Sequence, residues 1–89
     1  MGPTEALREV RRYATLGRVT MSRHAQQRAR ERGATFPDVR EALMNAVRCV
    51  PGDEDGRWNA TGPDLDDDPL TVVLVFEAGV LVVTVFERG

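Results

Sequence analysis

One short segment of the sequence gathers groups that can act on a phosphodiester. His24, Arg28 and Arg32 are each separated by four residues, and four residues of an α-helix leave a rotation of only about 40°, so the three side chains share a face. The start of a helix and the neighbouring Arg28 both disfavour the imidazolium form of His24. A general base needs the neutral imidazole, and arginines can stabilise the charge of a phosphorane. The pattern therefore indicates metal-free RNA cleavage, with no cofactor, in which His24 removes the 2′-hydroxyl proton.

That reaction also needs an acid to protonate the departing 5′-oxygen, and the sequence holds a single histidine. Three groups can supply the proton: His24 acting as a shuttle, Glu31 on the same segment, or Tyr13 from the preceding one. Spacing does not choose between them.

The same residues also admit non-catalytic interpretations. His24 can simply hydrogen-bond within the first helical turn. Arg28 and Arg32 repel each other at this spacing, so they require an anion, which can be phosphate or a carboxylate of the chain itself. One alternative is an internal clasp with the acidic loop. That loop holds Asp64, Asp66, Asp67 and Asp68; it lacks the central glycine and terminal glutamate of an EF-hand, so no metal site is predicted.

Two further residues are candidates by type alone. Trp58 can stack on a base of RNA, although the only tryptophan of a small protein is more often packed in the core. Cys49 is the only cysteine, which excludes an internal disulfide and a CxxC pair. It lies beside Val50 with no activating partner nearby in the sequence, so we predict a structural strand residue.

Composition limits the kind of protein that positions these groups. Eighty-nine residues with 42% hydrophobic and 29% charged content describe one small globular domain spanning residues 1–89. No apolar stretch approaches the roughly 20 residues that cross a bilayer, and the start lacks a signal-peptide pattern, so we expect a cytoplasmic protein without membrane contact. Residues 1–52 hold ten arginines against five acids, whereas residues 53–89 hold two against nine, and lysine is absent. The first half can therefore attract an anion.

The first half of the chain has helical spacing. Thr4 is the expected N-cap of a helix of about twelve residues that Gly17 ends, and Arg18 to Met21 form a short connector. Ser22 is the expected N-cap of the second helix. The apolar face of the first helix holds Ala6, Leu7, Val10, Tyr13 and Ala14.

The second helix is expected to run to Arg32, before Gly33, with Ala25 and Ala29 facing the body of the protein. Thr35 begins the third helix, and Asp38 three residues later approximates a capping box. Its apolar face holds Val39, Ala42, Leu43, Ala46 and Val47.

The second half is dense in valine, threonine and phenylalanine and predicts four strands, over residues 48–50, 57–61, 70–77 and 80–87. A two-residue turn at Ala78 and Gly79 joins the last two. It pairs Phe76 with Leu81, Leu74 with Val83 and Val72 with Val85 on the face toward the helices. The outer face then shows Thr71, Val73, Val75, Glu77, Val80, Val82, Thr84 and Phe86.

The series Ser22, His24, Ala25, Arg28, Arg32 and Gly33, followed by Asp38-Val39 and the later Thr-Val hairpin, resembles the domain of unknown function 4258 family over residues 18–87. That bacterial family is grouped with RNase-like toxins of the barnase, colicin and RelE superfamily. The resemblance implies an α+β fold in which N-terminal helices pack on an antiparallel four-stranded sheet. It also marks His24 and Arg28 on the helix, Trp58 and Gly62 on the second strand, and Thr84 on the last strand.

Two functions follow as hypotheses. The first is a small RNase-like domain, of the toxin type, with catalytic residues His24, Arg28 and Thr84; Arg32 and Trp58 bind the RNA, and an antitoxin-like protein is a possible partner. The second is a module of the same fold without enzymatic activity that binds RNA or protein. Its outer sheet face can also form a homodimer through Val73, Val75, Val82 and Phe86.

Overall fold

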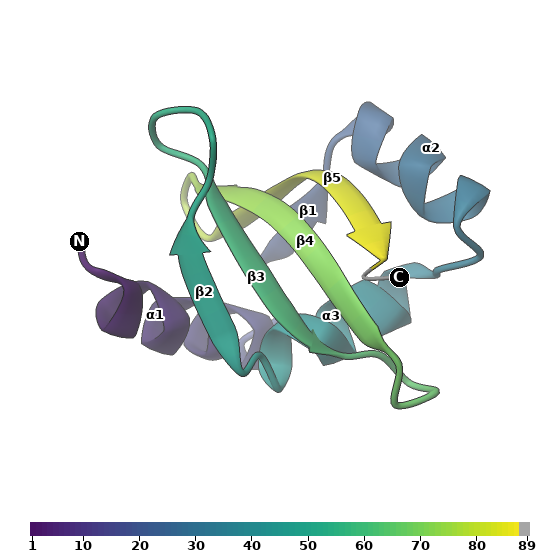
Figure 1. The fold of residues 1–89 in the computed structure, drawn as a ribbon, viewed down its shortest axis with the longest axis horizontal. Helices are drawn as coiled ribbons and strands as arrows, with labels where there is room; N and C mark the ends of the chain where they lie inside the picture. The colour runs from purple at the N-terminus through teal and green to yellow at the C-terminus, as the bar shows by residue number, and fades with distance from the viewer. Residues whose placement is uncertain (88–89) are drawn as a thin grey trace.

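The computed structural model describes residues 1–87, without the side chain of the last of these. Within that part of the chain, three helices and five strands confirm the α+β class (Figure 1). No helix there is both long enough and apolar enough to span a bilayer. The elements are α1 (Pro3–Thr15), β1 (Val19–Met21), α2 (Arg23–Glu31), α3 (Phe36–Met44), β2 (Arg48–Pro51), β3 (Trp58–Pro63), β4 (Pro69–Phe76) and β5 (Val80–Glu87).

The strands form one mixed sheet in the order β1-β5-β4-β3-β2. The four C-terminal strands are antiparallel to one another, but β1 runs parallel to β5, with Val19 opposite Val80. The prediction of only four antiparallel strands was therefore wrong, because the supposed connector from Arg18 to Met21 contains β1. Three residues are too few to show the alternation that marks a strand, so only the pairing with β5 reveals it.

The predicted starts of α2 and α3 are confirmed. The Ser22 hydroxyl accepts a hydrogen bond from the amide of Ala25 at 3.0 Å. Thr35 and Asp38 form a complete capping box: the Asp38 amide donates to Thr35 Oγ1 at 3.2 Å, and the Thr35 amide donates to Asp38 Oδ2 at 2.9 Å. Both helices thus begin where a local side chain satisfies free amides.

Two predicted helix limits were wrong. α1 begins at Pro3, so Thr4 lies inside the first turn and is not the N-cap; proline fits this position because its missing N–H is not needed there. α3 ends at Met44, and Val47 is exposed with its amide donating to the carbonyl of Thr61 at 2.8 Å. The chain therefore leaves the helix before Val47 and begins to pair with β3.

The β4–β5 hairpin differs from prediction at its turn. The turn has three residues, Glu77 to Gly79, so the two predicted pairs nearest to it are each off by one residue. A bulge beside Val73 and Leu74 then restores the predicted register. A one-residue slip exchanges the two faces of a strand, so Val80 and Val82, expected on the outer face, are buried at 2% and 0% exposure. The observed pairs are Phe76 with Val80, Leu74 with Val82 and Val72 with Val85.

One hydrophobic core joins the helices to the sheet. In Figure 1, β2, β3 and β4 pass in front of α1 and α3, and α2 lies beside β5. The other face of the sheet carries half-buried Val73, Val75 and Phe86, and a hydrogen bond of 2.9 Å between the hydroxyls of Thr61 and Thr71. The fully buried larger side chains are Leu43, Leu70, Leu74, Val10, Val39, Val72, Val80, Val82 and Val85.

Two arginines fasten α1 and α3 to each other at their C-terminal ends. Arg11 of α1 donates from Nε and Nη2 to the carbonyl of Ala46, just after α3, at 2.8 and 2.5 Å. Arg40 of α3 donates to the carbonyls of Ala14 and Thr15, at the end of α1, at 3.0 and 3.4 Å. Carbonyls at a helix C-terminus lack hydrogen-bond partners within the helix and carry partial negative charge. The guanidinium groups therefore supply both the missing hydrogen bonds and a compensating positive charge.

One close approach between a helix and the sheet requires a glycine. A Cβ at Gly62 of β3 would lie 2.1 Å from the carbonyl oxygen of Ala42 and 2.9 Å from Cα of Ala46. Both are backbone atoms and cannot rotate away. Gly62 therefore allows α3 to lie directly against β3, which gives this position a structural role.

We predict that Gly62→Ala destabilises the protein by more than about 3 kcal/mol, because α3 must shift away from β3 to admit one methyl group. Urea unfolding followed by circular dichroism measures the loss. Gly2→Ala is the control, because a Cβ at Gly2 meets no atom within 4 Å. A loss for Gly62→Ala no larger than that of the control would contradict the proposed close packing.

We predict that Arg40→Met lowers the free energy of unfolding by about 1–3 kcal/mol, because the last carbonyls of α1 lose a charged donor. Arg30→Met on α2 removes the same charge where no hydrogen bond or ion pair of the arginine side chain is present within residues 1–87. It is expected to change stability by less than about 0.5 kcal/mol. Equal losses of stability in Arg40→Met and Arg30→Met, measured by thermal unfolding, would show that removal of the charge alone accounts for the effect.

Candidate functional site

The start of α2 is attached to β5 at the bulge. The Ser22 amide donates to the carbonyl of Val82 at 2.9 Å, and the Ser22 hydroxyl donates to the carbonyl of Val83 at 3.3 Å. The same hydroxyl accepts from the amide of Ala25 at 3.0 Å. One side chain therefore both begins the helix and joins it to a strand 61 residues further along the chain.

Two of the predicted catalytic residues lie next to this attachment in the sequence. His24 follows Ser22 by two residues and lies exposed in the first turn of α2. Thr84 follows Val83 directly on β5 and is half-buried. We call the region of Ser22, His24, Val83 and Thr84 the α2–β5 junction. Bulges commonly redirect side chains next to functional sites, and here the bulge lies beside the first turn of a helix that carries a histidine.

Arg28, the third predicted catalytic residue, is paired on its own helix. Its guanidinium lies 3.2 Å from a carboxylate oxygen of Glu31, and the side-chain amide of Gln27 donates to the other oxygen at 3.3 Å. The anion expected beside Arg28 is thus Glu31, one turn along the helix. The two side chains are 37% and 48% exposed, and an ion pair this exposed contributes little to stability. A phosphate group can therefore replace Glu31 at Arg28.

Arg32 lies exposed as the C-cap of α2. The alternative of a clasp between Arg28 or Arg32 and the acidic loop is not realised within residues 1–87, where Arg28 pairs with Glu31. Ala25 and Ala29 are buried as predicted, so the polar face of α2 remains turned away from the core. That face holds Arg23, His24, Gln26, Gln27, Arg28, Arg30 and Glu31.

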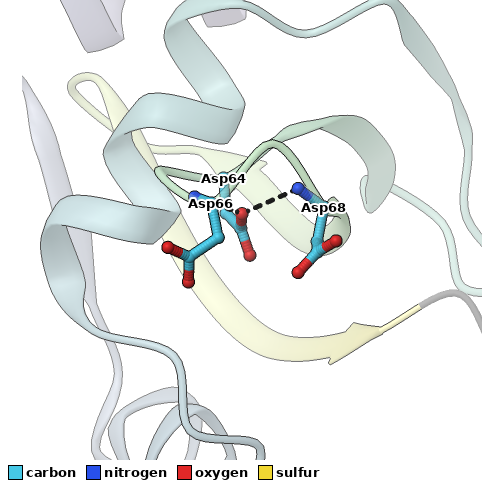
Figure 2. Close-up of side chains that lie close together, drawn as sticks. All are labelled: Asp64, Asp66 and Asp68. Carbon is cyan, nitrogen blue, oxygen red and sulfur yellow. Dashed lines mark hydrogen bonds between the residues drawn. The ribbon is translucent and has the colours of Figure 1, made fainter.

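Hydrogen bonds between the Asp64 side chain and backbone amides of the same loop hold the acidic loop in its conformation. Asp64 Oδ1 accepts from the amide of Asp66 at 2.8 Å and from the amide of Asp68 at 2.9 Å. The bond from Asp68 is visible in Figure 2. The three carboxylates come within 4.8 Å of one another as a result. The amide of Leu65 donates to Asp38 Oδ1 at 3.2 Å, which fixes the loop to the capping box of α3. These bonds account for the clustering of the carboxylates.

The aromatic candidates lie toward the turn of the hairpin. The rings of Trp58 and Tyr13 have centroids 6.5 and 6.2 Å from that of Phe76. Phe76 pairs with Val80, and Val80 and Thr84 are four residues apart on one strand, or about 13 Å. Both rings pack against the edge of the core, which is the packing role considered for Trp58. Of the three candidate proton donors, His24 and Glu31 lie on α2 and Tyr13 lies on α1.

The outer sheet face holds a pocket that sequence reasoning did not identify. Its volume is about 230 Å³, and it lies between the β2–β3 loop and strands β3, β4 and β5. No local sequence motif indicates this pocket, because its lining residues come from four segments that are brought together only by the register of the strands. We call it the outer pocket; it is lined by Asp53, Glu54, Arg57, Asn59, Val73, Thr84 and Phe86.

Cys49 lies in β2 with 4% of its surface exposed. Burial raises the pKa of its thiol to about 11. The thiolate is the reactive form of cysteine, so Cys49 has the structural position that was predicted for it.

The pKa of the Asp38 carboxyl is lowered, first by the amide of Thr35 and also by the Thr35 hydroxyl and the amide of Leu65, against the opposing effect of burial. A lowered folded-state pKa stabilises the protein above the unfolded-state value of about 3.9, and that stabilisation is lost as the pH falls. We predict that Asp38→Ala costs about 1–3 kcal/mol at pH 7.

The same substitution is expected to cost clearly less at pH 2.5, which urea unfolding at both pH values measures. Asp66→Ala removes an exposed carboxylate of the acidic loop and serves as the control. A cost for Asp38→Ala that does not change with pH would show that charge on this carboxyl does not stabilise the fold.

Comparison with known proteins gives no match for this chain among family models, curated proteins or solved structures. The resemblance to the domain of unknown function 4258 family therefore stays a prediction from the residues.

Proposed function

We propose that the protein is a small RNase-like domain of the toxin type that cleaves RNA at the α2–β5 junction without a metal ion. The observation that carries this proposal is the pair of hydrogen bonds from Ser22 to β5. They join the helix that bears His24 to the strand that bears Thr84. A histidine, a hydroxyl and an arginine are groups suited to phosphoryl transfer, and on this proposal His24, Thr84 and Arg28 surround the scissile phosphate.

In the proposed reaction, His24 takes the proton of the ribose 2′-hydroxyl. The 2′-oxygen then bonds to phosphorus, and the bond from phosphorus to the 5′-oxygen breaks. The leaving oxygen receives a proton from His24 or Glu31, which yields a 2′,3′-cyclic phosphate and a free 5′-hydroxyl. Arg28, released from Glu31, and the Thr84 hydroxyl stabilise the negative phosphoryl oxygens, while Arg32 attracts the next phosphate along the strand.

The order of elements agrees with the family resemblance. An antiparallel meander of β2, β3, β4 and β5 follows three helices, as in the RelE-like and barnase-like fold that the resemblance implies; β1 is an addition at the edge of the sheet. On this proposal RNA is the substrate, and an antitoxin-like protein that covers the basic face of α2 is a natural partner.

We predict that the purified protein cleaves a mixed-sequence RNA in EDTA, and that His24→Ala lowers the cleavage rate at least about 100-fold, because a positioned general base contributes 10²–10⁴-fold. Arg28→Ala is expected to lower the rate at least about 10-fold through lost charge stabilisation. Gel electrophoresis of end-labelled RNA gives the rates and shows whether cyclic phosphate ends form.

Arg30→Ala is the matched control, because it removes the same charge from an exposed position of the same helix. It is expected to retain activity within a few-fold of the wild type, and circular dichroism checks that each variant is folded. RNA left intact by the wild type, or equal loss in all three variants, would contradict the proposal and favour a binding module without enzymatic activity.

A further inference from the structure

The outer pocket is built on a row of paired residues that crosses three strands. Asn59 of β3 is opposite Val73 of β4, and Val73 is opposite Thr84 of β5. Phe86 lies two residues beyond Thr84 on β5 and lines the same pocket. The floor is therefore apolar in the middle at Val73, with one polar side chain at each end of the row and one aromatic ring beside it.

The β2–β3 loop supplies the wall of the pocket. Its base closes with a hydrogen bond of 2.7 Å from the amide of Gly52 to the carbonyl of Arg57, and an ion pair of 2.9 Å joins Arg57 to Glu54. A Cβ at Gly52 would lie 3.2 Å from Asn59 Oδ1 and also 3.2 Å from Cβ of Arg57. A side chain at position 52 would therefore crowd both Asn59 and Arg57.

The size of the outer pocket limits its ligand. Pockets that enclose drug-sized molecules have volumes of about 300–1,000 Å³, and the outer pocket, at about 230 Å³, is smaller. It suits one planar ring system. Phe86 offers an aromatic surface on which such a ring can stack, which is the common means of holding a base of single-stranded nucleic acid.

The polar groups of the pocket distinguish among ring systems. The side-chain amide of Asn59 has no hydrogen-bond partner within residues 1–87, so it is free to pair with the edge of a base as donor and acceptor together. Asp53 adds a carboxylate, which only accepts. Asn59 and Asp53 thus place two acceptors in the lining of the same pocket. Two acceptors match an amino group, since its two N–H bonds can each be used. Adenine and cytosine carry such a group beside a ring nitrogen acceptor, and uracil does not.

Thr84 connects the outer pocket to the α2–β5 junction, because it lines the first and belongs to the second. Acidic residues of the β2–β3 loop would repel a phosphate, whereas the face of α2 is rich in arginine. A nucleotide is therefore expected to lie with its base in the outer pocket and its phosphate toward α2.

We propose that the outer pocket binds one nucleobase of the RNA strand and selects adenine or cytosine over uracil. The proposal rests on the proposed function for its RNA substrate and specifies which nucleotide lies next to the cleaved bond. Asn59 and Asp53 recognise the amino group, Phe86 stacks on the ring, and Val73 forms the floor.

Amide chemical shifts of ¹⁵N-labelled protein during titration with AMP, CMP and UMP test this directly. We expect the shifts to concentrate at Gly52 to Asn59 and at Thr84 to Phe86, and AMP and CMP to bind at least about fivefold more tightly than UMP, because a bidentate contact to a base is worth about 1–3 kcal/mol. Asn59→Leu removes both the donor and the acceptor of the amide and is expected to reduce this preference. Phe86→Leu is expected to weaken binding of all three at least about fivefold.

Phe36→Leu is the matched control, since Phe36 is an exposed aromatic residue outside the outer pocket; it is expected to leave all three affinities unchanged. Equal affinities for the three nucleotides, or shifts confined to the helices, would overturn the proposal. The titration uses mononucleotides, which carry no phosphodiester bond between nucleosides, so it is independent of cleavage. If RNA is cleaved but the pocket shows no preference, only this inference fails; if the pocket discriminates but RNA stays intact, only the proposed function fails.

Discussion

The position of α2 depends on the hydroxyl of Ser22. A helix of nine residues is not stable alone in water, and α2 buries only Ala25 and Ala29, two of the smallest side chains. Such a helix gains little from hydrophobic burial, so the hydrogen bonds that Ser22 makes to Ala25, Val82 and Val83 have an unusually large share in holding it. The remaining surface of the helix is thereby left for polar side chains, and the arrangement of His24 relative to β5 follows from it.

Arginine has two different uses in this chain. Arg11 and Arg40 each direct a guanidinium at carbonyls of the neighbouring helix and are part of the fold. Arg28 and Arg32, in contrast, lie on an exposed helix face, where Arg28 meets only a solvent-accessible carboxylate. The guanidinium group is planar and has several N–H donors, so it can bind both a backbone carbonyl and a carboxylate or phosphate. The absence of lysine is therefore compatible with both the stability of the helical layer and the binding of phosphate.

Sequence patterns predicted those features of the fold that local interactions determine. The caps at Ser22 and Thr35 and the core positions of the helices depend on residues three or four apart. The structure confirms both caps and buries the predicted alanines of all three helices, but Val47 lies beyond the end of α3 and is exposed. β1 and the three-residue turn depend on strands that meet across the sheet, so neither left a local signal. The spacing of His24 and Arg28 identified the helix side of the candidate site, and the family resemblance pointed to Thr84. The outer pocket needs the register of three strands and the shape of a loop, which the sequence alone did not provide.

The parallel pairing of β1 with β5 has a consequence for biosynthesis. α2 follows β1 directly, but both must wait for β5, which is translated last among the described elements. Contacts between segments this far apart form only after the intervening chain has emerged. The helix that carries His24 therefore has no docking site on the growing chain until β5 leaves the ribosome. Under the function proposed above, the chain would acquire nuclease activity only after β5 has emerged, and it would stay inactive beside the ribosomal RNA and messenger during its own synthesis.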